Sequence, residues 1–176
     1  QASLTKEGLD LQHMGRVETH TAIASIYVED SGANRIAVYP GASATLAPSD
    51  AVSAMTSFPD AHYLVSQLEI NQKVVLAALE SARKATLTTI LNIAPYAPLI
   101  PGIVDNTTWL IANEVELEGL LGHHGESVEI SEMPLADIEH QISRWSRTIS
   151  CNLIVTLGSR GAIGCVEDTA FSFEGD

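Results

Sequence analysis

Along most of the chain, short apolar runs alternate with longer segments in which apolar residues recur every three to four positions. The runs predict strands at residues 62–66, 86–91, 109–112 and 153–156. The longer segments predict amphipathic helices at 72–85, 114–121 and 135–149. This alternation implies an α/β fold: a doubly wound, mostly parallel sheet with helices on both faces.

The region before residue 62 has a different pattern. Residues 20–28 and 35–39 are rich in β-formers, and the turn residues Asp30–Asn34 between them predict a β-hairpin over 20–39. Small residues such as Ala24 make one face of this hairpin shallow. That is compatible with a lid over a small ligand, but a packed hairpin is the simpler interpretation. Two more strands are predicted near the end, at 162–166 and 170–173.

Polar residues and glycines follow each of the four central strands. In open α/β sheets, ligands bind beyond the carboxyl ends of parallel strands, so these positions are candidates for a binding site. In chain order, they are Gln67, Glu69, Asn92, Asn113, Glu114, Glu116, Gly158 and Ser159. Their occurrence at successive strand ends is stronger evidence than any single residue.

The last of these strand ends lies in the stretch NLIVTLGSRGA, residues 152–162. A buried strand followed by a turn between Gly158 and Gly161 can bring backbone N–H groups close to phosphate oxygens, because glycine adds no Cβ and tolerates positive φ. The spacing matches neither the P-loop nor the dinucleotide-binding fingerprint. Taken alone, the stretch favours an ordinary hairpin turn over a phosphate site.

Asn113 and Glu116 lie three residues apart at the predicted start of a helix. An amide and a carboxylate in this arrangement can hold a hydrated Mg²⁺, but the same pair forms a capping box, which local evidence favours. Glu69 is similarly ambiguous. It can be an acidic residue favoured by the helix dipole or an acceptor for ligand hydroxyls.

Composition narrows the function classes. With 22 acidic and 9 basic residues among 176, and a net charge of −13, the chain has no basic surface for nucleic acid or an anionic membrane. No apolar run approaches the length of a membrane span. Cys151 and Cys165 flank the glycine turn, so a disulfide is conceivable, but free buried thiols in a reducing compartment are favoured. No four-ligand metal site and no Ser-His-Asp pairing is evident.

Five blocks in order resemble the ribokinase family, within the phosphofructokinase-B-type carbohydrate kinases. They are TAIASIYVEDSGANRIAVYPGA, QLEI, LNIAPYAPL, VDNTTWLIANEVELEGLLG and IVTLGSRGA. The resemblance covers nearly the whole chain, with Asn71, Ile93 and Ser43 as departures in loops. It implies one partial ribokinase-like domain over residues 1–176, with 20–39 as the lid hairpin. The N- and C-terminal parts of the domain would lie outside this chain.

The resemblance also implies roles for particular residues. Glu69 matches the family's sugar-binding carboxylate, and the N-x-x-E motif that handles Mg²⁺ and phosphate matches Asn113 and Glu116. The other matched positions are apolar sugar-facing residues of the lid (Ala24, Ile26, Val38) and the nucleotide-binding turn (Thr156, Gly158, Ser159, Gly161).

The resemblance further implies a cytoplasmic homodimer, joined through the lid hairpin, that uses ATP, Mg²⁺ and a monovalent cation such as K⁺ to phosphorylate the 5-hydroxyl of ribose. The family's catalytic base would fall after Asp176, so no catalytic residue is assigned within the chain and the isolated chain is expected to be inactive. Two alternatives stay open: a kinase for another small sugar or a nucleoside, and a kinase-like binding subunit without catalysis.

Overall fold

The computed structural model describes residues 2–30 and 34–175 and divides the chain into two compact units, residues 1–46 and 47–176. Residues 31–33 of the predicted hairpin turn lie outside the described residues. The first unit contains a short helix α1 (Ala2–Lys6), strands β1 (Ile23–Val28) and β2 (Asn34–Tyr39), and a 3₁₀ turn η1 (Gly41–Thr45).

Strands β1 and β2 form the predicted antiparallel hairpin. Ala24 pairs with Val38 and Ile26 with Ile36, so these four side chains share one face of the hairpin. Every residue of β1 is exposed within the structure, including Ile26 at 60% and Val28 at 70%. The hairpin therefore presents apolar side chains that nothing in its own unit covers.

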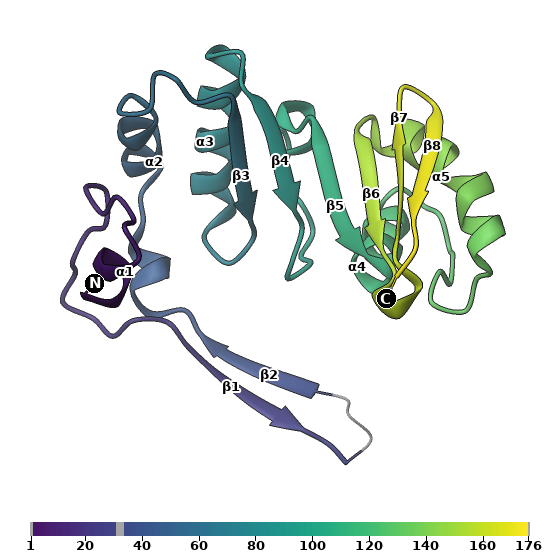
Figure 1. Cartoon of the computed structure of the whole chain (residues 1–176), viewed down its shortest axis with the longest axis horizontal. Helices are drawn as coiled ribbons and strands as arrows, with labels where there is room; N and C mark the ends of the chain where they lie inside the picture. Colours follow the sequence, from purple (N-terminus) through teal and green to yellow (C-terminus); the bar gives the residue numbers. More distant parts are fainter. Residues whose placement is uncertain (1, 31–33, 176) are drawn as a thin grey trace. The chain divides into compact units, whose positions relative to one another are not determined.

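The second unit is a six-stranded sheet with helices (Figure 1). The strand order is β3-β4-β5-β6-β7-β8. Strands β3 to β6 run parallel to one another, β7 runs antiparallel to β6, and β8 runs antiparallel to β7. Its strands are β3 (Tyr63–Gln67), β4 (Thr88–Asn92), β5 (Trp109–Asn113), β6 (Asn152–Thr156), β7 (Ala162–Val166) and β8 (Thr169–Phe173). Its helices are α2 (Pro48–Met55), α3 (Gln72–Lys84), α4 (Glu114–His123) and α5 (Leu135–Ile149), with 3₁₀ turns η2 (Val104–Asn106) and η3 (Gly158–Arg160). The α/β class, with a mostly parallel sheet and an antiparallel hairpin, is confirmed.

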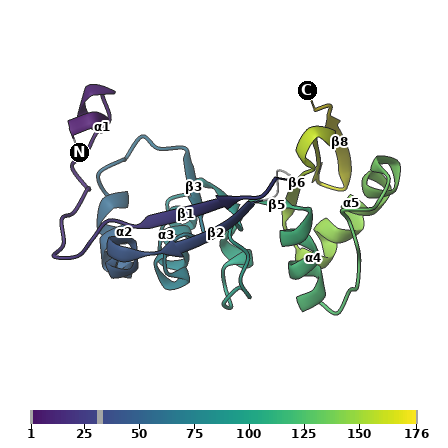
Figure 2. The ribbon, with the colours of Figure 1, turned by 90° about the horizontal axis from the view of Figure 1, so that it is seen from below.

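Alternate residues of the central strands pack into one hydrophobic core. Leu91, Leu110 and Leu153 point to the face that α3, α4 and α5 cover, and all three are fully buried with Leu79 and Trp145. Figure 2 shows α3 and α4 on the same side of the sheet. The intervening residues on the opposite face are exposed or half-buried, namely Tyr63, Val65, Ile90, Trp109, Ile111 and Ile154.

The helix ends depart slightly from prediction. Helix α5 begins and ends where its apolar spacing predicts, at residues 135 and 149. Helix α4 is predicted over 114–121 but continues to His123, and the chain turns at Gly125, which has a positive φ of 82°. Among the described helices, none has the length and apolar character needed to cross a bilayer.

The two cysteines do not face each other across the hairpin. Cys165 in β7 pairs with Leu153, whereas Cys151 precedes β6, and both thiols are free and buried. The Cys151 Sγ donates to the Thr107 carbonyl oxygen at 3.3 Å. Burial raises the pKa of the Cys151 thiol from 9.0 to about 12.

This raised pKa predicts an unreactive thiol, because the thiolate is the nucleophile. In the folded chain at pH 8, Cys151 should react with iodoacetamide far more slowly than free cysteine, and it should react normally in denaturant; alkylation followed by mass spectrometry measures both. Since ionisation favours the unfolded state, the thiol's contribution to stability is complete below pH 9 and is lost as pH rises towards about 12. Rapid native alkylation would contradict the buried placement.

A core substitution in α5 tests the packing of the helices on the sheet. Ile142 is fully buried, whereas Leu135 at the start of the same helix is 42% exposed. Ile142→Ala should lower the free energy of unfolding by about 2–5 kcal/mol, and Leu135→Ala should lower it by less than about 1 kcal/mol. Urea denaturation of both variants measures the difference, and equal losses would contradict the assignment of the buried face.

Candidate functional site

The carboxyl ends of the parallel strands bring several predicted site residues to one edge of the sheet. Gln67 pairs with Asn92 across β3 and β4, and Asn113 pairs with Thr156 across β5 and β6. The Thr156 hydroxyl donates to the Ala112 carbonyl oxygen at 3.4 Å. The end of β5 and the end of β6 are therefore direct neighbours, although 43 residues of sequence separate Asn113 from Thr156.

Asn113 and Glu116 form the capping box that local sequence favoured. The Glu116 N–H donates to the Asn113 Oδ1 and the Asn113 N–H donates to the Glu116 Oε2, both at 2.8 Å. Glu116 is only 9% exposed, so its carboxylate is fixed in place. Its second oxygen, Oε1, accepts no hydrogen bond from any described residue, and it remains available to a cation or a bound water.

A metal at this edge would have few protein ligands. Within residues 2–30 and 34–175, no group of three or more His, Cys, Asp or Glu side chains is arranged to hold a metal ion. Mg²⁺ is compatible with such a site, because it usually keeps several waters and binds through one or two carboxylates together with substrate phosphates. Glu116 and Asn113 fit that pattern, whereas an ion held by protein alone does not.

The glycine turn after β6 is a hairpin turn, as its sequence favoured. It joins β6 to the antiparallel strand β7, and the Leu157 N–H donates to the Gly161 carbonyl oxygen at 2.8 Å. Gly158 has a φ of 57° and open space around its Cα, whereas Gly161 has a φ of 92° and lies against Phe173 and Gly175. Gly161 is therefore required for close packing of the turn against Phe173 and Gly175, whereas the side of the turn at Gly158 is open.

Within this turn, two of the four backbone N–H groups donate to no described residue. The N–H groups of Arg160 and Gly161 bond to Leu157 and Gly158 carbonyl oxygens, at 3.0 and 3.1 Å. The N–H groups of Gly158 and Ser159 donate to no described residue. Consecutive free N–H groups beside a residue with positive φ form a concavity that suits an anion.

Arg160 ties the turn to its neighbours, a role that sequence reasoning did not assign. Its guanidinium donates to the Met133 carbonyl oxygen at 2.7 Å and pairs with Glu114, the first residue of α4, at 3.2 Å. Both side chains are mostly buried, with 31% and 21% exposure. The only sequence signal was a lone arginine between two glycines, which does not reveal partners 27 and 46 residues away.

The remaining predicted residues lie after β3 in the second unit and on the hairpin of the first unit. Glu69 is exposed after β3 and makes no hydrogen bond or ion pair with a described residue. Asn71, which follows it, caps α3 by accepting a hydrogen bond from the Lys73 N–H at 2.9 Å. The apolar residues Ala24, Ile26 and Val38 lie together on one face of the β1–β2 hairpin, in the first unit.

Comparison with known proteins places this chain in a family. The model of the pfkB family carbohydrate kinases matches residues 1–175. The chain belongs to the pfkB family, whose members are carbohydrate kinases.

Curated relatives include kinases for more than one pentose. The chain is 35% identical over 105 residues to a ribokinase of Staphylococcus aureus, covering 60% of this chain and 34% of the relative. It is 29% identical over 166 residues to a ribokinase of Schizosaccharomyces pombe, covering 92% and 50%. It is 28% identical over 172 residues to a deoxyribokinase of Salmonella typhi, covering 94% and 53%. The chain thus spans about half the length of these relatives or less.

Solved structures agree with the fold. A ribokinase from Thermotoga maritima superposes with a TM-score of 0.71 at 25% identity, covering 90% of this chain and 50% of that one. A ribokinase from Cryptococcus neoformans, solved in complex with ADP, superposes with a TM-score of 0.69 at 25% identity, covering 89% and 52%.

The two glycines of the turn should respond differently to alanine. At Gly161, a Cβ would overlap the Phe173 carbonyl oxygen, so Gly161→Ala should lower the free energy of unfolding by about 3 kcal/mol or more. At Gly158 only the positive φ is disfavoured, so the loss should be about 1 kcal/mol. Urea denaturation separates these values; similar losses at both positions would contradict the packing of the turn.

Proposed function

We propose that the protein containing this chain transfers the γ-phosphoryl group of ATP to the 5-hydroxyl of D-ribose. One observation carries the nucleotide part of this proposal: the pairing of Asn113 with Thr156, which sets the N-x-x-E box beside the glycine turn. The ribokinase names among its relatives, and the ADP bound to the Cryptococcus ribokinase, support the same assignment.

The glycine turn is assigned to the nucleotide. The free N–H groups of Gly158 and Ser159 can donate to phosphate oxygens, and the lack of a side chain at Gly158 allows close approach. Thr156 supplies a hydroxyl at the strand end, and Gly161 fixes the shape of the turn. Backbone donors of this kind can bind an anion even in a chain with a net charge of −13.

Asn113 and Glu116 are assigned to Mg²⁺ and the phosphates. When bound, Mg²⁺ neutralises charge that develops on the transferred phosphoryl group. The residues of this chain would position the ion. The capping box holds the Glu116 side chain in one rotamer, in which its Oε1 can bind a cation or one of the waters of that cation. A monovalent cation such as K⁺ belongs to the same proposal, with no residue assigned to it.

The sugar is assigned to Glu69 and to the hairpin. Glu69 is exposed and unpaired among the described residues, so its carboxylate is free to accept hydrogen bonds from sugar hydroxyls. Ala24, Ile26 and Val38 share one exposed apolar face, a surface suited to the carbon skeleton of a sugar or to a second copy of the hairpin in a homodimer. A cytoplasmic location belongs to the same proposal, since ATP is available there.

A second candidate is phosphorylation of a different small sugar. The deoxyribokinase relative covers 94% of this chain at 28% identity, close to the values for the Schizosaccharomyces ribokinase. Phosphorylation rates with ribose and 2-deoxyribose, measured on the product of the complete reading frame, distinguish the two candidates. Phosphorylation of neither sugar, together with retained nucleotide binding, would favour a non-catalytic binding subunit instead.

Nucleotide binding by the chain tests the central assignment. Gly158→Ala should weaken binding of MgATP about tenfold or more, because a methyl group then stands where the phosphate approaches. Gly125→Ala is the matched control: its φ is also positive, at 82°, and no atom lies within 4 Å of the added Cβ, but it follows α4 at the opposite end of that helix. Titration calorimetry with circular dichroism compares the variants at equal folded fraction.

The proposal fails if the wild-type chain shows no saturable nucleotide binding, or if Gly158→Ala binds as well as Gly125→Ala. Glu116→Gln adds a second readout. It keeps the capping geometry but removes the charge, so it should weaken MgATP much more than ATP measured with EDTA. An equal effect on both would remove Glu116 from the metal assignment.

A further inference from the structure

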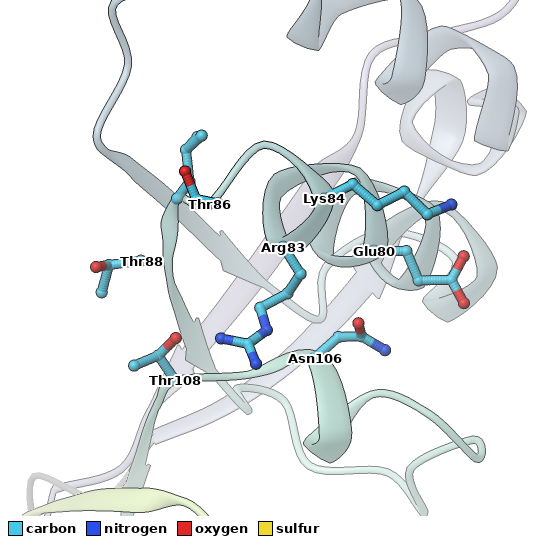
Figure 3. A pocket seen from close by; sticks show the side chains of 8 residues that line it. Glu80, Arg83, Lys84, Thr86, Thr88, Asn106 and Thr108 are labelled. Carbon is cyan, nitrogen blue, oxygen red and sulfur yellow. The ribbon is translucent and has the colours of Figure 1, made fainter.

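A cavity lies at the edge of the sheet opposite to the candidate site. It has a volume of about 770 Å³ and lies at the amino ends of β4 and β5, beside the last turn of α3 (Figure 3). Its walls come from α3, the turn before β4, and the segment from η2 to β5. The lining residues are Glu80, Arg83, Lys84, Thr86, Leu87, Thr88, Asn106 and Thr108.

Arg83 is unusual among the arginines of this acidic chain. Arg35, Arg144, Arg147 and Arg160 each pair with a carboxylate at 2.7 to 3.2 Å. The Arg83 guanidinium has no hydrogen-bond or ion-pair partner among the described residues, although acidic residues outnumber basic ones 22 to 9. Its guanidinium points towards Asn106 and Thr108 across the cavity (Figure 3). All five of its N–H donors are thus free to bind a ligand.

Other polar groups line the same cavity. The Thr88 hydroxyl has no described partner. The Lys84 ammonium has none either, but in Figure 3 it points away from the Arg83 guanidinium, on the side of Glu80. The Thr108 hydroxyl donates to the Thr89 Oγ1 at 3.1 Å, since the Thr89 hydroxyl itself donates to the Asn106 carbonyl oxygen at 2.7 Å. Asn106 Nδ2 uses one hydrogen for the Gly102 carbonyl oxygen at 2.8 Å. Charge balance also favours an anion, because two cations line the cavity and Glu80 is its single carboxylate.

A simpler explanation for Arg83 and Lys84 is that both lie in the last turn of α3, where the helix dipole favours basic residues. However, the carbonyl oxygens there are already satisfied by backbone donors. The Ala85, Thr86 and Leu87 N–H groups bond to Ser81, Arg83 and Ala82 at 2.9 to 3.1 Å, and this closes the helix in a Schellman motif. The side chains of Arg83 and Lys84 are not needed to cap the helix.

The residue that closes this motif is itself unusual. Thr86 has a φ of 61°, a conformation in which glycine is usual and a β-branched residue is strained. Such outliers cluster at ligand sites, because a folded chain tolerates strain where a side chain is needed. At this position, the threonine side chain lines the cavity, and its hydroxyl donates to the Ala85 carbonyl oxygen at 2.7 Å.

We propose that this cavity binds the phosphoryl group of a small phosphorylated metabolite, at a site separate from the proposed nucleotide site. A phosphoryl dianion offers three terminal oxygens: the Arg83 fork can bind two, and the Thr88 hydroxyl can donate to the third, with Lys84 adding positive charge at the rim. A carboxylate has only two oxygens, and the Arg83 guanidinium alone would bind both. The volume far exceeds that of a phosphate ion, which leaves space for the organic part of the ligand.

Binding of glycerol 3-phosphate and inorganic phosphate to the chain tests this assignment. NMR titration of the wild type should show saturable shifts at Thr86, Thr88 and Thr108. Arg83→Ala should weaken binding at least about tenfold, as expected for the loss of a charge-assisted hydrogen bond. Arg144→Ala is the control, since it removes the same charge from an exposed side chain paired with Glu126 and should leave the affinity unchanged.

The site is rejected if the wild type shows no saturable shifts at these threonines, or if Arg83→Ala binds as tightly as Arg144→Ala. It is also rejected if the shifts appear only at Gly158 and Ser159, because the ligand then occupies the proposed nucleotide site. Acetate that competes as strongly as phosphate would overturn the choice of a phosphoryl group. Arg83 is exposed, so its replacement is expected to leave the fold intact, which circular dichroism checks.

Discussion

The parallel pairing of β5 with β6 is the constraint on which the candidate site depends. Leu110 packs beside Leu153 and Ala112 beside Val155, all of them buried, so the hydrophobic face fixes this register. A slip of one residue would turn the buried side chains outward, which the core does not tolerate. The same register sets Asn113 beside Thr156 at the strand ends. Packing in the core thus determines the geometry of polar residues that lie outside it.

Polar contacts then hold the irregular segments around that edge. Arg160 joins the glycine turn to the start of α4 and to the Met133 carbonyl oxygen. From the other side, the Glu118 carboxylate accepts hydrogen bonds from the Ile130 and Ser131 N–H groups at 2.6 and 3.1 Å. The segment before α5 is therefore fixed between two charged side chains. Mostly buried pairs of this kind position groups more than they stabilise the fold, because desolvation offsets much of their attraction.

The two edges of the sheet differ in the groups that could bind an anion. At the carboxyl edge, the donors are backbone N–H groups of a turn, and the nearby side chains include the acidic Glu114 and Glu116. At the amino edge, the backbone donors of the α3 end are used internally, so side chains such as Arg83 would do the binding. The carboxyl edge therefore suits a phosphate that is bound to a metal cation, and the amino edge suits a phosphate without a metal cation.

The sequence by itself determined the elements and their class, because hydrophobic periodicity is local: the ends of the six sheet strands β3 to β8 and of α5 were predicted to within about two residues. Local sequence also favoured a capping box of Asn113 and Glu116 at the start of α4, since that pairing spans one helical turn. It did not show that Asn113 meets Thr156, that Arg160 reaches Glu114, or that Arg83 faces a cavity without a partner. Those contacts join residues far apart in the chain, and only the packing of the sheet and its helices decides which of them meet.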